Sequence, residues 1–293
     1  MPRPPTRLPE AEWQDRARRH RDRVARFAEP YLERRSHGAR HPVEDFLFTY
    51  YTQKPGQLMR WHPGSAVVLA GPAALERVDW KYYAADDDGV RVDAQRFAEE
   101  RREAIAFARV ILGRTAARPA QFGCFGLHEW AMAYRSAVNG VRHDYLQLRL
   151  GADGTDGVVD SARIRCTHFD AFRFYTPEAV PLNEHVPTRQ TQRDLEQPGC
   201  LHANMDLYKW AYKLTPLLPS EIVMDCFELS WRIRTMDMRA SPYDLAAWGY
   251  TPIAIETTEG KAEYVRLQRG FAEESQALRV RLLELLDAAL DAP

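Results

Sequence analysis

Apolar residues recur every three or four positions along several long stretches of the chain, a pattern that predicts a mainly helical protein. Within residues 10–35, Trp13, Val24 and Tyr31 fall on one stripe, while arginines crowd the opposite side. This distribution predicts an amphipathic helix inside an N-terminal segment, residues 1–40. We interpret the arginine run as the solvated face of that helix rather than as an arm that binds phosphate.

The same periodicity over residues 93–113 and 259–290 predicts two further helices, the second of which closes the fold. A different pattern lies between them, where YLQLRL and VVDSARIRC flank the Gly/Asp run GADGTDG. Short apolar segments around such turn residues are typical of a β-hairpin, which we place near residues 145–168. The predicted fold class is therefore mainly α (α+β with a small antiparallel β element), in which residues 41–293 form a single helical, catalytic domain.

Composition limits the classes of protein that this chain can belong to. It has 293 residues, a hydrophobic content of 45% and a formal net charge of -1. The lack of a basic excess counts against a nucleic-acid-binding surface, although a local basic stripe would suffice for one. No apolar run reaches the roughly 20 residues of a membrane helix, and the N-terminus has no apolar secretory segment. We expect a cytoplasmic protein with no membrane partner and with thiols rather than disulfides.

Three of the four cysteines stand shortly before a histidine and an acid. These triplets are Cys124/His128/Glu129, Cys166/His168/Asp170 and Cys200/His202/Asp206. Positions i and i+4 share a face of a helix, which would pair His202 with Asp206, and alternate residues share a face of a strand. Each residue alone is more often part of an ordinary core than a ligand, but their repetition favours a common site. No Cys-x2-Cys pair exists, so the pattern does not predict a zinc finger.

The triplets predict a metal site in one of two forms. His168, Asp170 and His202 match the two-histidine, one-carboxylate ligand set of non-heme iron enzymes. The other form is a helical site built from His128, Glu129, His202 and Asp206. Under this metal hypothesis, which is an alternative to the one that the family resemblance below implies, the candidate metal ligands are His128, Cys166, His168 and His202. The metal would be iron or zinc.

Four acids lie among apolar and aromatic residues, where an unpaired carboxylate is costly. They are Asp170, Asp206, Asp225 and Asp237, with Arg173, Lys209, Arg232 and Arg239 as basic partners nearby in sequence. The plainer interpretation is a network of internal ion pairs that holds helices in register. The functional interpretation is a carboxylate that stabilises a cation or activates water, because perturbed acids gather at active sites.

Five segments carry a resemblance to a known family. They are HPVEDFLFTYYTQKPGQLMRWHPG (41–64), FGCFGLHEWAMAYR (122–135), RCTHFDAFRFYTPEAVPLN (165–183), PGCLHANMDLYKWAYKL (198–214) and MDMRASPYDL (236–245). Through them, residues 41–275 resemble a family of actinobacterial proteins commonly labelled 3-methyladenine DNA glycosylase. The resemblance implies a hydrolase that cleaves the N-glycosidic bond of a modified purine. It implies damaged DNA or a purine nucleoside as the partner, and no cofactor.

Such a reaction needs a carboxylate that stabilises the developing sugar cation or activates water, together with aromatic rings that stack the extruded base. Under this hypothesis the candidate catalytic residues are Asp170, Asp206 and Glu129. The candidate substrate-binding residues are Trp130, Tyr175 and Trp210 for stacking, and Arg173 and Lys209 for phosphate. If DNA is the substrate, binding must weaken steeply with salt, because counterions are released on binding.

Two alternatives from other classes stay open. The first is a metal-dependent oxidoreductase of the non-heme iron type, acting on a small molecule through the Cys/His/Asp residues. The second is a non-catalytic ligand-binding or scaffold protein, which we rank last because buried polar groups are a costly way to build a scaffold. Protein partners are unknown under every hypothesis. The most informative observation for choosing between these functions is whether five side chains converge around one cavity. They are Cys166, His168, Asp170, His202 and Asp206.

Overall fold

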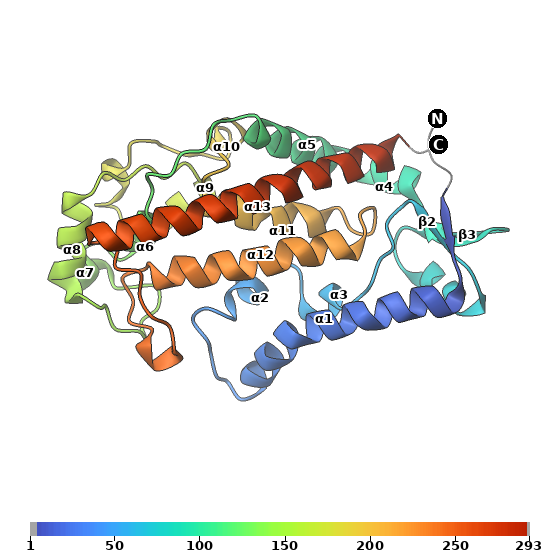
Figure 1. Ribbon diagram of the computed structural model, residues 1–293, viewed down its shortest axis with the longest axis horizontal. Helices are drawn as coiled ribbons and strands as arrows, with labels where there is room; N and C mark the ends of the chain where they lie inside the picture. The colour runs from blue at the N-terminus through green and yellow to red at the C-terminus, as the bar shows by residue number, and fades with distance from the viewer. Residues whose placement is uncertain (1–4, 292–293) are drawn as a thin grey trace. The chain divides into compact units, whose positions relative to one another are not determined.

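The computed structural model describes residues 5–291, and its internal contacts divide the chain into two compact units. Unit 1 comprises Met1–Leu112, Leu207–Glu228 and Leu278–Pro293, and unit 2 comprises Gly113–Asp206 and Leu229–Ala277. Helices dominate the described residues, with one small sheet in unit 1, which confirms the predicted mainly α fold (Figure 1). The first four residues of the predicted segment 1–40 and the last two of the predicted domain 41–293 lie outside the described residues.

The sheet of unit 1 has four short strands in the order β1-β2-β4-β3. They are β1 (Thr6–Leu8), β2 (Val67–Leu69), β3 (Tyr83–Asp86) and β4 (Gly89–Val92). Strands β2/β4 and β3/β4 are antiparallel, but β1 runs parallel to β2. The β element is therefore mixed rather than purely antiparallel as predicted. The long stretch between β1 and β2 contains a helix and has ample length for the crossover that a parallel pair requires.

Helix α1 (Glu10–Ser36) confirms the predicted N-terminal amphipathic helix. Trp13, Val24 and Tyr31 are buried along one side, as their spacing indicated. Arginines on the other side lie in solvent, where for example Arg16 pairs with Glu12 one turn earlier at 2.7 Å. Burial of one face and solvation of the other thus follow the sequence pattern directly.

The remaining helices of unit 1 are short, apart from four that have residues in both units. The short ones are α2 (Phe46–Tyr50), α3 (Pro55–Leu58), η1 (Pro72–Asp79) and α4 (Ala94–Glu100). The four are α5 (Arg102–Ala116), α11 (Leu201–Lys213), α12 (Ser220–Arg239) and α13 (Thr258–Leu290). Helices α4 and α5 correspond to the helix predicted over residues 93–113, and α13 to the one predicted over residues 259–290.

The core of unit 1 holds a buried arginine among tryptophans. Arg77 is 6% exposed, and its guanidinium carbon lies 4.5 Å from the ring centroid of Trp80, 5.2 Å from that of Trp13 and 5.4 Å from that of Trp61. Its Nη1 donates to the Trp61 carbonyl at 2.6 Å. The charge is therefore solvated by ring faces and a backbone oxygen.

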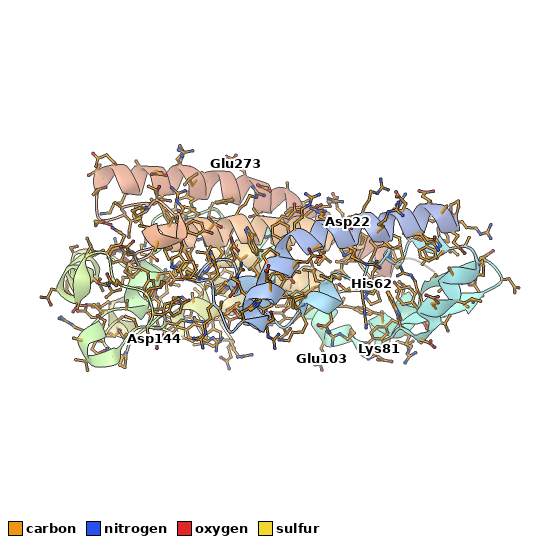
Figure 2. The ribbon with its side chains drawn as sticks, turned by 90° about the horizontal axis from the view of Figure 1, so that it is seen from below. Asp22, His62, Lys81, Glu103, Asp144 and Glu273 are labelled. Atoms are coloured by element: carbon orange, nitrogen blue, oxygen red, sulfur yellow. The ribbon has the colours of Figure 1, made fainter. Side chains whose placement is uncertain are left out.

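His62, labelled in Figure 2, lies beside this cluster, and its ring centroid is 5.5 Å from that of Trp80. Its Nδ1 is 2.9 Å from the Tyr83 hydroxyl. Burial, assisted by the charge of Arg77, lowers the pKa of His62 to about 3. This histidine is therefore neutral at physiological pH.

Unit 2 consists of helices and connecting loops. Besides its parts of the four long helices, it contains α6 (Leu127–Met132), α7 (Ser136–Asn139), α8 (Gly151–Ser161), α9 (Phe169–Phe172), η2 (Val180–Leu182), α10 (Gln192–Leu195) and η3 (Ala246–Trp248). Helices α6, α7 and α8, drawn in green, lie close together within this unit (Figure 1).

The hairpin predicted near residues 145–168 is wrong, because the Gly/Asp run forms helix α8. Thr155 and Val159, four positions apart, are both buried on one face of that helix. The flanking segments form isolated bridges with more distant partners: Leu148 with Tyr243 and Ile164 with Asn183. Glycine and aspartate disfavour a helix by propensity, but burial of one face in the folded protein outweighs that preference.

Among residues 5–291, no helix combines the length and the apolar character needed to cross a bilayer.

Candidate metal centre

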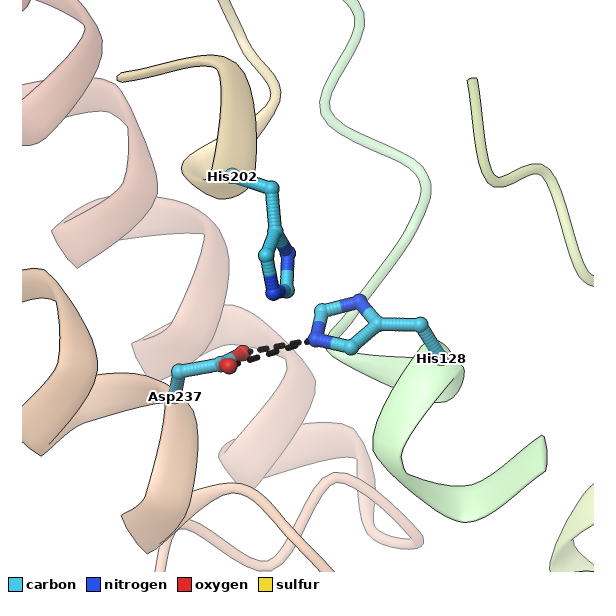
Figure 3. A group of neighbouring side chains, drawn as sticks. All are labelled: His128, His202 and Asp237. Carbon is cyan, nitrogen blue, oxygen red and sulfur yellow. Dashed lines mark hydrogen bonds and ion pairs between the residues drawn. The ribbon is translucent and has the colours of Figure 1, made fainter. Parts of the chain in front are cut away.

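Two histidines and an aspartate from three helices come together within unit 2. His128 comes from α6, His202 from the first turn of α11 and Asp237 from the end of α12, and each is at most 8% exposed. Nε2 of His128 lies 3.0 Å from Oδ1 and 3.2 Å from Oδ2 of Asp237. The ring of His202 points at this pair, as Figure 3 shows. One ligand atom from each residue lies within 4.8 Å of the others, and we call these three residues ligand set A.

A second group of the same kind lies in the same unit. His168 directly precedes α9, Glu196 directly follows α10, and Asp206 is on α11; all three are at most 2% exposed. Nε2 of His168 is 3.4 Å from Oε1 of Glu196 and 3.4 Å from Oδ2 of Asp206. These separations are long for N–H···O hydrogen bonds. Around a metal with bonds of about 2.1 Å, tetrahedral ligand atoms lie about 3.4 Å apart. We call these residues ligand set B.

His202 links the two ligand sets. Its ring centroid is 4.4 Å from that of His128, edge to face, and 5.3 Å from that of His168, nearly parallel. His202 and Asp206 are one helical turn apart on α11, so this one helix contributes a residue to each set. The six residues of sets A and B therefore form one continuous buried cluster.

An ion pair borders set A. Nη1 of Arg234 lies 2.7 Å from Oε1 of Glu129 and 3.5 Å from Oδ2 of Asp237. Arg234 is 3% and Glu129 is 5% exposed. Burial acts to raise the pKa of Glu129, but the positive charge of Arg234, with a contribution from His128, outweighs it and sets that pKa at about 2. Glu129 is therefore a buried carboxylate.

The pKa values of the two histidines of set A are shifted in opposite directions. Burial opposes the charged form of His128, but the carboxylate of Asp237 outweighs burial and raises the pKa of His128. For His202, burial and the neighbouring positive charge of His128 both lower the pKa well below its ordinary value. No hydrogen bond to a ring nitrogen of His202 is present within residues 5–291. A neutral imidazole with a free lone pair is the form that binds a metal.

Glutamine side chains hold the segment that precedes α11. Oε1 of Gln197 accepts from the backbone N–H groups of Gln121 and Gly199 at 2.8 and 2.7 Å. Nε2 of Gln268 donates to the Gly199 carbonyl at 2.6 Å. Any side chain at Gly199 would collide with the Gln121 backbone. This close contact fixes the backbone three residues before His202.

Asn183 fixes the segment that carries His168. Its Oδ1 accepts from the N–H of Cys166 at 2.7 Å, and its Nδ2 donates to the Cys166 carbonyl at 3.0 Å. The Cys166 thiol is 3.6 Å from the His168 carbonyl, and burial raises the pKa of this thiol to about 12. Cys166 is thus a protonated thiol, and no cysteine belongs to either ligand set.

Of the residues predicted as metal ligands, the structure brings His128, His168 and His202 into the cluster. Cys166 lies in the same segment but belongs to neither ligand set. Asp170 is the second residue of α9, and its Oδ1 is 3.3 Å from Nε of Arg173; both side chains are partly exposed. The predicted convergence of Cys166, His168 and Asp170 on one strand face does not occur, because a helix begins at Phe169 and turns Asp170 elsewhere.

The candidate catalytic acids Asp206 and Glu129 lie in or beside the cluster, whereas Asp170 does not. Of the candidate stacking residues, Trp130 is fully buried and its indole N–H donates to the Ala240 carbonyl at 2.8 Å. Tyr175 is also buried. Lys209 and Trp210 belong to unit 1, where Nζ of the lysine lies 5.0 Å from the indole centroid.

Two residues of the cluster were not predicted as ligands. The sequence marked Asp237 as an acid in an apolar context, with Arg232 and Arg239 as partners, but its neighbours are His128 and Arg234. Glu196 carried no signal, because it stands in the polar run Glu-Gln-Pro-Gly, which looks like an exposed loop yet is buried.

Comparison of the chain with known protein families, with characterised proteins and with solved structures gave no match.

Proposed function

We propose that this protein is a metal-dependent enzyme whose centre is the cluster of ligand sets A and B. The observation that carries the proposal is the convergence of His128, His202 and Asp237 from three separate helices into a buried group. Burying several imidazoles and carboxylates against each other is costly unless a cation or a complete hydrogen-bond network balances them. Nδ1 of His168 has no hydrogen-bond partner among the described residues, so hydrogen bonding alone leaves the network incomplete.

The donor atoms narrow the choice of metal. Both sets consist of imidazole nitrogens and carboxylate oxygens, without thiolate. Two histidines and one carboxylate are the ligand set of non-heme iron(II) enzymes, which leave coordination positions open for a substrate. Iron in set A is therefore the favoured metal, and an oxidation of a small molecule is the chemistry that it supplies when bound.

The side chains around the ligands have positioning roles under this proposal. Arg234 holds Glu129 as a carboxylate one residue from His128 and lies near Asp237, where its charge orients both acids. Gln192 donates to Oε1 of Glu196 at 2.6 Å and so fixes one ligand of set B. Such outer partners typically fix the orientation and the basicity of metal ligands.

Metal analysis of the full-length protein, purified without chelator, tests the proposal. We expect a stoichiometric transition metal, with iron the favoured element, and its loss in His202→Ala. The matched control is His185→Ala, in which a histidine of the same unit outside both ligand sets is removed; this variant should keep its metal. Metal-free wild-type protein, or an equal metal content in both variants, would contradict a metal centre.

Hydrolysis of an N-glycosidic bond is the second candidate function. The observation that favours it is the position of Asp206 and Glu129, two of the three predicted catalytic carboxylates, at the buried cluster. A carboxylate there would stabilise an oxocarbenium-like sugar or activate water. Release of 3-methyladenine from alkylated DNA or from the alkylated nucleoside, lost in Asp206→Asn, is the expected result. Release that persists in chelator-treated protein would favour this function over the metal-dependent one.

A further inference from the structure

Unit 2 contains a cavity of about 450 Å³ that is separate from ligand sets A and B. Three stretches of the chain line it, residues 123–127, 154–165 and 255–261. Small residues on α8 and just after it, such as Gly157 and Ala162, leave the space open, and nothing lies within 4 Å of a side chain built at Gly157. Polar and charged groups are therefore able to reach a bound molecule from several sides.

Positive charge predominates in the lining. Arg163, Arg165 and Lys261 contribute three cations. Glu184 pairs with both arginines, at 2.9 Å from Nε of Arg165. Glu184 thus offsets one of the three positive charges, which leaves an excess of two.

The acid within the lining does not cancel this excess. Glu256 is already paired with Arg149, whose Nη1 lies 2.9 Å from its Oε1. Lys261 has its ammonium group 5.9 Å from the ring centroid of Phe125, an arrangement that leaves the charge available to a ligand.

We infer that this cavity binds a phosphomonoester. Such a group carries about −1.5 to −2 charges at pH 7, which matches the excess in the lining. Guanidinium groups bind phosphate through paired N–H donors, and the ammonium of Lys261 adds a point charge. A carboxylate, with a single negative charge, would leave the excess only half balanced.

The cavity shares the turn before α6 with ligand set A. If the proposed function is correct, the cavity would bind the phosphate of the metal centre's substrate; this role, unlike the binding itself, rests on the proposed function. Leu127 lines the cavity, and the next residue along α6 is His128 of ligand set A. The turn before α6 is tightly held: Phe125 has a φ of +45°, which is uncommon for a bulky residue, and Gly126 packs against the ring of Tyr264. The same turn therefore forms the cavity wall and positions a ligand of the centre. The inferred substrate class is a small phosphorylated molecule.

Calorimetric titration of the full-length, chelator-treated protein tests this inference, with adenosine monophosphate, inorganic phosphate and adenosine as probes. We expect adenosine monophosphate and phosphate to bind and adenosine to bind at least about tenfold more weakly than the monophosphate. The double variant Arg163→Gln/Arg165→Gln should weaken monophosphate binding by about tenfold or more. Arg266→Gln, a matched removal of an exposed arginine on α13 outside the lining, should leave it unchanged.

A second variant is expected to change the affinity in the opposite direction, so that a loss of binding caused by misfolding can be recognised. Glu184→Gln frees both arginines from their acid, so it should tighten monophosphate binding by about threefold to tenfold. Equal binding of adenosine and its monophosphate, or an unchanged affinity in both the arginine double variant and Glu184→Gln, would overturn the inference. Loss of phosphate binding on chelator treatment would also overturn it, because the metal would then be the phosphate site. Binding by chelator-treated protein, when the untreated protein contains no metal, would retain the cavity and remove the metal centre.

Discussion

Both units bury charged side chains, but they stabilise them in different ways. In unit 1, Arg77 lies among tryptophan rings and donates to a backbone carbonyl, and His62 is kept neutral beside Tyr83. In unit 2, acids and histidines lie against each other, with Arg234 as the cation nearest set A. The first arrangement needs no bound ion, whereas the second concentrates groups whose ordinary use is to hold one.

We compare these two arrangements by what each contributes to the stability of the fold. A guanidinium on aromatic faces contributes packing as well as charge. A group of carboxylates and imidazoles contributes little packing, and replacing buried ion pairs by apolar residues is often neutral or stabilising. The second arrangement is therefore the one that the proposed function would account for. Three variants test this comparison.

The largest effect is expected from Arg234→Met in unit 2. Removing this cation leaves Glu129 as a buried carboxylate without its partner at 2.7 Å, which typically costs about 3–5 kcal/mol of unfolding free energy. Urea unfolding followed by circular dichroism measures this loss. The double variant Arg234→Met/Glu129→Gln should recover most of it, because no unpaired charge stays buried.

Arg232→Met provides the matched control, two positions earlier on α12. Arg232 pairs with Glu274 and about half of its side chain is exposed, so its removal should cost less than about 1 kcal/mol. A loss as large as that of Arg234→Met would mean that the helix, and not the buried pair, determines the result.

A smaller effect is expected from Arg77→Met in unit 1, about 2 kcal/mol. The variant loses the bond to the Trp61 carbonyl and the contacts with three indole rings, but methionine fills much of the same space and no acid is left unpaired. The same urea unfolding measures it, with Arg91→Met on the exposed side of β4 as control. A loss above that of Arg234→Met would reverse the proposed contrast between the units.

The smallest effect is a pH dependence at His62. Its folded-state pKa of about 3 lies below the ordinary value of 6.5, so its contribution to stability is complete above pH 6.5 and is lost as the pH falls toward 3. Between pH 7 and pH 5.5 the wild type should lose about 1 kcal/mol more than His62→Gln does. Parallel stability curves for the two proteins over that range would show that this histidine is not buried in its neutral form.

The parts of the fold that follow from local periodicity were predictable. Helices α1 and α13 carry long apolar stripes, and the stripe of Trp13, Val24 and Tyr31 is buried as expected. Helix α8 was not predictable in this way, because its glycines and aspartates have turn propensities and only tertiary burial of Thr155 and Val159 makes the segment helical.

The candidate site was predictable only where its members are close in sequence. The pair of His202 and Asp206 follows from one helical turn. The pair of His128 and Asp237 joins positions 109 residues apart, and no local spacing encodes it. Glu196 is buried because Gln192 and the surrounding loops enclose it, which again depends on distant packing.

His202 gives the centre one property that neither ligand set would have alone. Its ring lies edge-on to His128 of its own set and is stacked on His168 of the other. A rotation of this ring that suits an ion in set A also moves the surface against which His168 rests. If both sets hold a metal, as the proposed function allows, the second ion would enter a site already altered by the first. The two ions would then bind with unequal affinities, and the occupancy curve would depart from that of two independent sites.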